Sequence, residues 1–289
     1  MNFLERLGSL DRRWIFLFVA IAVTIPLLLQ RPAPVKPSPI VIDLYEAIDA
    51  LEPGSKVLLS LDYAPSTVPE NDPMSHAIAR HVLSRDLKLY LISIWATGPP
   101  LITNMIDTVI APDFPDARYG EDFVNLGFKV GNQGLIQSLT SDFRGQYTQD
   151  VGWGEFAARP VDEIAMMKGI RTISDFDYIA DIGSGFPGLK EWVQFAGDPT
   201  GVPVGGGVTA VEAPLLYPYY QAGQIDGLLG GLAGAAEYEA MLVGNYPRFG
   251  EAAQTALVRM FPQTWAHLVI VAFVVLGNIS YFAQRGRRR

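Results

Sequence analysis

Cysteine is absent from this chain of 289 residues, and only three histidines are present. Without cysteine the protein cannot form a disulfide scaffold, a cysteine-ligated zinc or iron–sulfur site, or a thiol nucleophile. Charged residues make up only 18% of the chain, against roughly 25% in typical soluble domains, which favours a membrane location. The net charge of -8 argues against nucleic acid as a partner.

Basic and acidic residues are separated along the chain. Residues 1–34 and 261–289 together carry eight Lys+Arg and two Asp+Glu, which leaves 14 basic and 28 acidic residues in the middle. Apolar runs at 14–30 and 265–282 lie within these basic ends. A long apolar segment beside arginines is typical of a transmembrane helix and its cytoplasmic flank. We therefore predict two spans in a bacterial inner membrane, with both termini cytoplasmic and the acidic middle periplasmic or extracellular.

Each apolar run has an alternative interpretation. The first also fits a cleavable signal peptide, although residues 27–35 contain no clear small-x-small cleavage site. The second also fits a buried core helix, but Arg285 and the three arginines at 287–289 follow it directly and favour a span. The lipid bilayer is accordingly the first partner that the sequence predicts.

The chain between the spans predicts one α/β domain. The expected parts are a cytoplasmic N-terminus (1–13), a first span (14–30), a proline-rich linker (31–39), an outer domain (40–260), a second span (265–282) and a basic cytoplasmic tail (283–289). Apolar runs typical of buried parallel strands lie at 56–63, 87–95, 123–130, 177–182, 202–209 and 225–229. Helices are expected at 40–51, 72–84, 99–110, 133–143, 187–196, 211–221, 233–242 and 250–260. This alternation predicts a Rossmann-like, mostly parallel sheet with helices on both faces.

Ligands of open α/β sheets bind outside the carboxyl ends of the strands. The residues expected there that could bind a ligand are Asp62, Trp95, Asp181, Gly183, Gly185, Gly188 and Glu212. Asp62 and Asp181 could form a carboxylate pair for acid–base chemistry or metal binding. Alternatively, each aspartate could cap the turn after its strand.

Gly183, Gly185 and Gly188 match the pattern G-x-G-x-x-G between an expected strand and an expected helix. Such a turn could bring the backbone close to a dinucleotide or another anion at the helix N-terminus. It could equally be a tight turn without a ligand, and Pro187 removes one N–H donor from it. The chain contains no HExxH motif, no P-loop and no G-x-S-x-G elbow, so we assign no cofactor, metal or catalytic residue.

Two further clusters could form a subunit interface or simply pack inside the domain. They are the aromatic group of Tyr217, Tyr219 and Tyr220 and the small-residue group of Gly227, Gly230, Gly231 and Gly234. Aromatic side chains are enriched at interfaces, and glycines let two backbones approach closely.

Residues 3–23, FLERLGSLDRRWIFLFVAIAV, and residues 207–239, GVTAVEAPLLYPYYQAGQIDGLLGGLAGAAEYE, resemble a family of bacterial membrane proteins. The resemblance implies two spans and an outer α/β domain, and it carries no activity. We expect a non-enzymatic subunit of a membrane assembly, formed with copies of itself or with a multi-pass membrane protein. The alternatives are a ligand-binding domain of a transporter or sensor and, less favoured, an extracytoplasmic enzyme.

Overall fold

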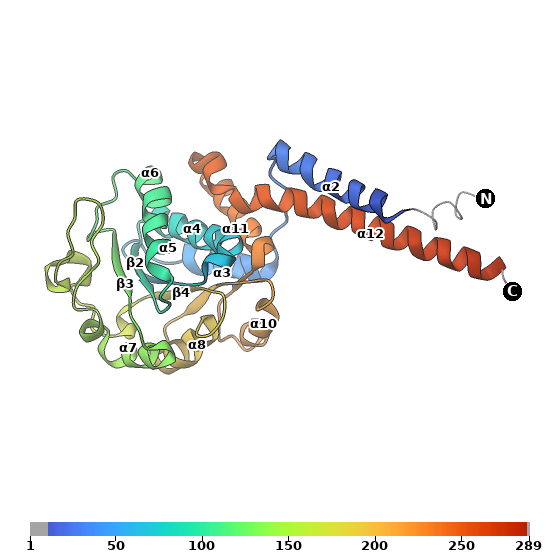
Figure 1. Cartoon of the computed structure of the whole chain (residues 1–289). Helices are drawn as coiled ribbons and strands as arrows, with labels where there is room; N and C mark the ends of the chain where they lie inside the picture. Colours follow the sequence, from blue (N-terminus) through green and yellow to red (C-terminus); the bar gives the residue numbers. More distant parts are fainter. Residues whose placement is uncertain (1–10, 288–289) are drawn as a thin grey trace. The chain divides into compact units, whose positions relative to one another are not determined.

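Six parallel strands form the sheet, in the order β3-β2-β1-β4-β5-β6 (Figure 1). The computed structural model describes residues 11–287. The strands are β1 (Lys56–Asp62), β2 (Lys88–Ser93), β3 (Phe123–Phe128), β4 (Tyr178–Gly183), β5 (Val204–Val208) and β6 (Leu228–Gly230). The strand order reverses between β1 and β4, which makes that junction the topological switch point. The prediction of a Rossmann-like parallel sheet is confirmed.

Burial on both faces explains why the strands read as continuous apolar runs. Every residue from Val57 to Asp62 is buried, and the same holds for all of β4. The edges of the sheet are protected in two ways. β6 has only three residues, and the loop after α7 covers β3, where the Val151 N–H donates to the Asn125 carbonyl at 2.9 Å. Short or covered edges prevent pairing with other chains.

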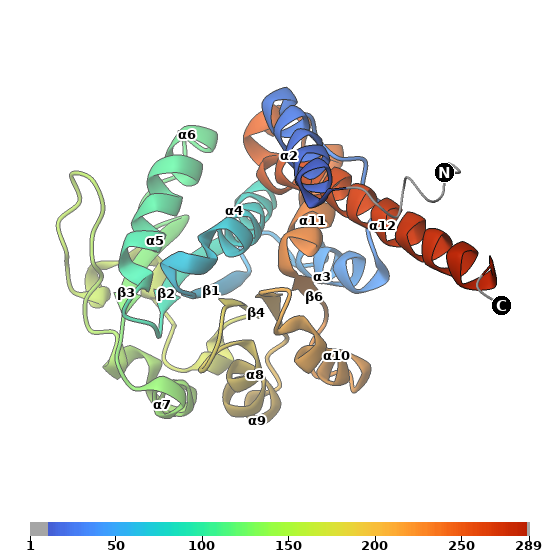
Figure 2. The same cartoon turned by 45° about the vertical axis from the view of Figure 1, so that its right-hand side comes forward.

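Helices cover both faces of the sheet (Figure 2). One face carries α3 (Pro39–Asp49), α4 (Val68–Ser84), α5 (Gly98–Met105) and α11 (Gly231–Asn245). The other carries α7 (Asn132–Gln146), α8 (Leu189–Trp192) and α10 (Ala213–Gln221). Shorter elements are η1 (Pro65–Thr67), η2 (Ile106–Ile110), α6 (Ala111–Asp113), η3 (Val161–Glu163), η4 (Ala165–Met167), η5 (Ile173–Asp175), η6 (Val193–Gly197), α9 (Asp198–Thr200) and η7 (Pro247–Ala253). The π-helical turn η2 continues α5 to its predicted end at Ile110, and α6 extends the stretch to Asp113. The π-helical turn η6 likewise continues α8, and α9 extends that stretch past its predicted end at 196 to Thr200.

Two helix predictions are wrong. α4 begins at Val68, before the predicted start at Asp72, because Pro69 in its first turn already favours a helix start. Asp72 therefore does not cap the helix; its Oδ1 instead accepts a hydrogen bond from the Tyr63 hydroxyl at 2.8 Å. The predicted helix at 250–260 is not continuous: Gly250 at its start has a positive φ of 49°, and Gln254, with φ of -123°, separates η7 from α12.

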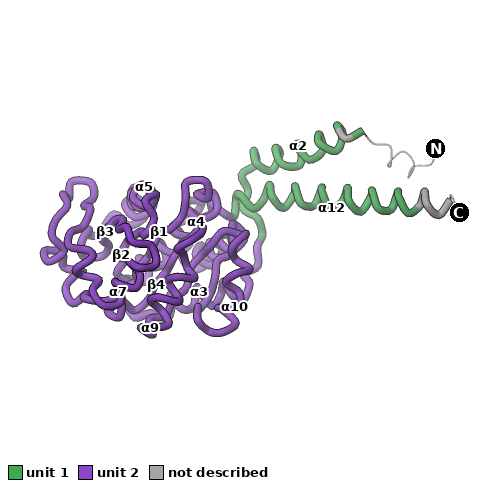
Figure 3. Tube along the Cα trace, turned by 60° about the horizontal axis from the view of Figure 1, so that its bottom comes forward, with its two compact units in different colours: residues 1–34, 257–289 green, residues 35–256 purple. Residues whose placement is uncertain are grey.

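The chain divides into two compact units, coloured separately in Figure 3. Residues 35–256 form the α/β domain, and the remaining residues form the helix pair of α2 (Arg12–Leu29) and α12 (Thr255–Arg287). Within the helix pair, the rings of Phe18 and Phe273 lie 6.0 Å apart. The Ala33 N–H donates to the Leu257 carbonyl at 2.9 Å. The two helices therefore pack against each other.

One described helix is long and apolar enough to cross a membrane. Residues 255–282 of α12 form 28 apolar-rich helical residues, with 6% of the most apolar window buried. The apolar part of α2 has only 17 residues, 13–29, or about 25 Å against the roughly 30 Å of a bilayer core. α2 stops there because Gln30 adopts a left-handed conformation before the proline-rich linker. The prediction of two spans is therefore corrected to one candidate span.

Candidate functional site

The fold brings the predicted ligand-binding residues to one edge of the sheet. Asp62 ends β1, Trp95 follows β2, and Asp181 and Gly183 lie at the end of β4. Gly185 and Gly188 form the turn between β4 and α8, and Glu212 immediately precedes α10. All seven residues therefore lie at the carboxyl edge, around the switch point.

The Asp62 carboxylate is fully buried and surrounded by hydrogen-bond donors. It accepts bonds from the Ser60 hydroxyl (2.6 Å), the Ile94 N–H (2.8 Å), the Trp192 indole N–H (3.1 Å) and the Ser93 hydroxyl (3.2 Å). Four donors stabilise the ionised form of a buried carboxylate. Asp62 therefore connects β1, β2 and α8 from inside the domain.

Asp181 is equally buried but has a different environment. Neither of its carboxyl oxygens receives a hydrogen bond from a donor in the described part of the chain. Burial, the adjacent Asp62 carboxylate and the charges of Glu212 and Glu191 raise the pKa of Asp181 well above its usual range. Burial also raises the pKa of Asp62, and Asp181 lies within hydrogen-bonding reach of it. Of the two carboxyl groups, Asp181 therefore binds a proton more readily, because donors surround the Asp62 carboxylate and none among the described residues binds Asp181.

The loops after β1 and β4 close the switch point. The Ser184 N–H donates to the Asp62 carbonyl at 3.1 Å, and the Ala64 N–H donates to the Ser184 hydroxyl at 3.1 Å. The Asn71 amide donates to the Gly183 carbonyl at 2.9 Å. Asp62 and Asp181 are both 0% exposed beneath these loops, so the carboxylate pair is sealed from solvent.

Internal contacts also account for the glycine pattern. A Cβ at Gly188 would lie 2.6 Å from the Gly185 carbonyl oxygen, and a Cβ at Gly185 would lie 3.2 Å from the Trp95 ring. The Gly188 N–H donates to Glu191 Oε2 at 3.0 Å, so a carboxylate of the chain already occupies the N-terminus of α8. The negative charge of Glu191 argues against a phosphate in the turn.

A shallow hollow of about 380 Å³ lies beside the switch point, over the carboxyl ends of β2 and β3. Its lining residues are Ile94, Trp95, Ala96, Thr97, Phe128, Val130, Asn132, Phe186 and Pro187. The Trp95 indole N–H donates to the Pro187 carbonyl at 2.7 Å, which fixes one wall. Trp95 is the only one of the predicted ligand-binding residues that lines this hollow. The remaining lining residues were not predicted, because they come from three separate turns of the chain.

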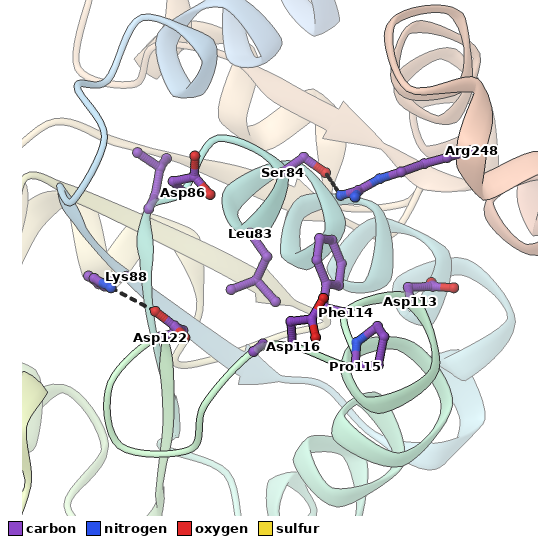
Figure 4. Close-up of a pocket in the computed structure, with 12 residues that line it drawn as sticks. Leu83, Ser84, Asp86, Lys88, Asp113, Phe114, Pro115, Asp116, Asp122 and Arg248 are labelled. Atoms are coloured by element: carbon purple, nitrogen blue, oxygen red, sulfur yellow. Dashed lines mark hydrogen bonds and ion pairs between the residues drawn. The ribbon is translucent and has the colours of Figure 1, made fainter.

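A pocket of about 450 Å³ opens at the opposite, amino-terminal edge of the sheet (Figure 4). The Lys88 ammonium pairs with Asp122 at 2.8 Å. The Arg248 guanidinium lies 4.9 Å from the centre of the Phe114 ring and donates to the Ser84 hydroxyl at 3.2 Å. Lys88, Asp122 and Arg248 of this pocket are thus engaged with other side chains. The pocket contains none of the candidate site residues predicted from the sequence.

The tyrosine cluster lies on α10. The Tyr219 hydroxyl accepts a hydrogen bond from the Gln194 amide at 2.7 Å, and the Tyr220 hydroxyl donates to Asp43. These two side chains are therefore held within the domain, whereas Tyr217 is exposed.

The glycine group lies between β6 and its neighbours. A Cβ at Gly227 would meet the backbone of Leu44 in α3, and one at Gly230 would lie 3.1 Å from Ala213. Side chains at Gly231 and Gly234 would approach Ala210 to 2.6 Å and Leu229 to 2.8 Å. These glycines allow close internal packing and leave little free surface for a subunit contact.

Sequence reasoning missed a buried hydrogen-bonded cluster around His81. Its Nδ1 lies 2.7 Å from the Tyr238 hydroxyl, its Nε2 lies 3.2 Å from Asp49, and its ring stacks on Tyr45 at 4.1 Å. Burial lowers the pKa of His81 to about 4, so the imidazole is neutral at pH 7. The cluster joins α3, α4 and α11, which no local sequence pattern could indicate.

Comparison with protein-family models, with curated proteins and with solved structures finds no match. The resemblance of the sequence to a bacterial membrane-protein family therefore gains no support from these comparisons. Within residues 11–287, no group of three or more His, Asp or Glu side chains is arranged to hold a metal ion. The function proposed below therefore rests on the sequence and the structure of this chain.

Proposed function

We propose that this protein is a membrane-attached, non-enzymatic subunit of a bacterial membrane assembly, with its α/β domain outside the cytoplasm. The observation that carries the proposal is α12. Only 6% of the most apolar 18-residue window of its segment 255–282 is buried, whereas the apolar residues of the central strands β1 and β4 are all buried. Exposed apolar surface of this length requires lipid or another protein to cover it.

The sealed carboxylate pair supports a non-enzymatic role. Asp62 and Asp181 are the strongest acid–base candidates in the sequence, but both are fully buried, and Asp62 is engaged by four internal donors. A general acid or base must reach its substrate within hydrogen-bond distance. The geometry therefore favours a structural role for the pair.

An exposed apolar face of α10 and the turn before it supports assembly. Val211, Pro214, Leu215 and Pro218 share one face at helical spacing, and Val211 and Leu215 are 87% and 67% exposed. The only charged residue between positions 207 and 224 is Glu212, which accepts a hydrogen bond from Thr209. In a two-fold dimer the same surface of each copy faces the other, so charged residues on that surface would face like charges. Because this face is apolar and nearly uncharged, it suits pairing with the same face of a second copy.

The charge distribution supports the orientation. Four arginines follow the apolar part of α12, and the positive-inside rule assigns such a tail to the cytoplasm. The acidic α/β domain then lies on the outer side. α2 is a shorter apolar helix, and its Phe18 ring lies 6.0 Å from the Phe273 ring of α12.

The membrane and assembly steps are tested on the full chain. We expect the protein to stay in the membrane fraction after a high-pH carbonate wash, and to have the native mass of an oligomer after gentle solubilisation. Leu215→Glu should reduce that mass to a monomer, whereas Val151→Glu, at an exposed apolar site in the loop over β3, should not. Release by carbonate refutes membrane attachment. A monomeric wild type, or a mass unaffected by Leu215→Glu, refutes the α10 contact; a second protein in the complex identifies a heteromeric assembly instead.

Orientation is tested with single cysteines, because the chain contains none of its own. A membrane-impermeant thiol reagent added to intact cells should label Ser66→Cys, an exposed position in η1. Labelling of Ser66→Cys only after permeabilisation would refute the outward orientation. Ser9→Cys reports on the other terminus: labelling only after permeabilisation shows that α2 crosses the membrane, and labelling in intact cells shows that it does not.

A further inference from the structure

The hollow beside the switch point differs chemically from every other concave site described above. None of its nine lining residues is ionisable, in a chain with a net charge of -8. The amino-edge pocket, by contrast, is lined by Lys88, Arg248 and four aspartates. Burying an ion without a counter-charge is costly, so the hollow selects for an uncharged ligand.

Aromatic side chains form two sides of the hollow. The Trp95 ring is fixed by its hydrogen bond to Pro187 and by the close approach of Gly185. Phe186 is 62% exposed on the turn between β4 and α8, and Val130, which also lines the hollow, is 83% exposed. Covering these exposed apolar side chains with a flat apolar group removes apolar surface from water, which favours binding of such a group.

One polar side chain in the lining is free to orient a ligand. The Thr97 hydroxyl is used, because it donates to the Tyr63 carbonyl at 2.8 Å. Asn132, at the first position of α7, has no hydrogen-bond partner for its side-chain amide among residues 11–287. An amide both donates and accepts, so Asn132 can bind a hydroxyl, a carbonyl or an N–H group.

We propose that this hollow binds a neutral small molecule with a flat apolar ring and one hydrogen-bonding group. The ring would pack against Trp95 and Phe186, and the polar group would bind the Asn132 amide. A volume of about 380 Å³ lies within the roughly 300–1,000 Å³ of small-molecule sites. At about 30 Å³ for each non-hydrogen atom, as in liquid water, it holds about a dozen atoms. This site goes beyond the membrane-subunit role and does not depend on it.

Indole is a suitable probe, because it is neutral, flat and carries one N–H donor. The full chain is placed in phospholipid nanodiscs with a single trifluoromethyl tag on Val130→Cys, at the rim of the hollow. The matched control carries the tag on Val211→Cys, an exposed apolar position before α10, and each nanodisc holds one copy of the chain so that the proposed α10 contact does not cover it. Fluorine NMR then separates binding in the hollow from partition of indole into lipid, which reaches both tags alike.

We expect a saturable shift of the tag at position 130 and no saturable shift at position 211. Phe186→Ala should weaken binding about threefold to tenfold, and its exposure makes the fold insensitive to the change, which circular dichroism verifies. Asn132→Ala should weaken the binding of indole but not of 1-methylindole, which lacks the N–H group. Indole-3-acetate, an anion, should not bind. A linear response at position 130, a saturable response at position 211, or equal affinity for indole-3-acetate would overturn the proposal.

Discussion

Replacing Asp181 by asparagine should stabilise the protein increasingly as the pH rises. Burial and the neighbouring carboxylates raise the pKa of Asp181 in the folded state, whereas an unfolded aspartate titrates near about 3.9. Between these two values the folded chain holds a proton that the unfolded chain has lost. Wild-type stability therefore falls as the pH rises through this window, by about 1.4 kcal/mol per pH unit, and levels off above the folded pKa.

The asparagine variant does not titrate at this position, and its amide can still donate to Asp62. The difference in free energy of unfolding between Asp181→Asn and wild type should therefore grow by about 1.4 kcal/mol per pH unit above about pH 4. Titrating groups that do not interact with Asp181, His81 among them, cancel in this difference, whereas its acidic neighbours Asp62, Glu191 and Glu212 contribute to it. Urea unfolding of the full chain in detergent, followed by tryptophan fluorescence from pH 4 to 8, measures it.

Asp62→Asn is the matched control, because it changes the partner of the same pair. An amide at position 62 turns an NH₂ group towards some of the donors that now bind the carboxylate. Each buried donor left unpaired costs about 1–3 kcal/mol, so we expect a loss of about 2–4 kcal/mol. A pH-independent difference for Asp181→Asn, or equal destabilisation by both variants, would refute a protonated Asp181.

Two further predictions concern stability. Because burial lowers the pKa of His81 to about 4, the folded protein should lose up to about 3 kcal/mol of stability as the pH falls from about 6.5 to 4. His81→Gln should remove this dependence in acid-side urea titrations, and an unchanged slope would contradict it. Gly188→Ala should destabilise by about 1–3 kcal/mol, because its Cβ would lie 2.6 Å from a backbone oxygen. Its control, Gly244→Ala, has open space in helix α11 and should stabilise by about 0.5–1 kcal/mol in the same thermal unfolding assay.

The sheet could be predicted from the sequence because each strand is buried on both faces. Such strands are near-continuous apolar runs, which differ from the alternating apolar and polar pattern of a half-exposed strand. It failed at α4, where the strong signal Asp72-Pro73 hid the weaker start at Pro69. It also over-counted the spans. Apolar composition alone does not fix helix length, and the left-handed Gln30 ends α2 early.

The predicted site residues gathered at one edge because parallel strands place their carboxyl ends together. The spacing of Gly183, Gly185 and Gly188 could not show whether the backbone N–H groups of their turn were available to a ligand. Glu191, three residues after Gly188, was the available signal, because a glutamate at this distance can accept a hydrogen bond from the backbone N–H of the residue before the helix, as the glutamate of a capping box does. The hollow had no local signal. Phe128, Asn132 and Phe186 meet there only through the tertiary fold.

The sealed carboxylate pair and the open hollow are parts of one arrangement. Asp62 accepts a hydrogen bond from the Ile94 N–H and shares the Ser93 hydroxyl proton with the Leu61 carbonyl, at 3.2 and 2.7 Å. The same hydroxyl accepts a bond from the Trp95 N–H at 3.0 Å. Asp62 thereby fixes the backbone that carries Trp95 into the hollow. Asp181 makes no such bond to this segment.

Asp62→Asn should therefore weaken indole binding in the hollow, although residue 62 is fully buried and does not line it. Coupling through a hydrogen-bonded segment of this kind is worth about 0.5–2 kcal/mol, or roughly a twofold to thirtyfold loss of affinity. Asp181→Asn should leave the affinity unchanged. Both variants are measured with the tag at position 130, at a pH and temperature where circular dichroism shows them folded. Equal affinities for wild type and Asp62→Asn would show that the carboxylate pair supports the core alone and not the wall of the hollow.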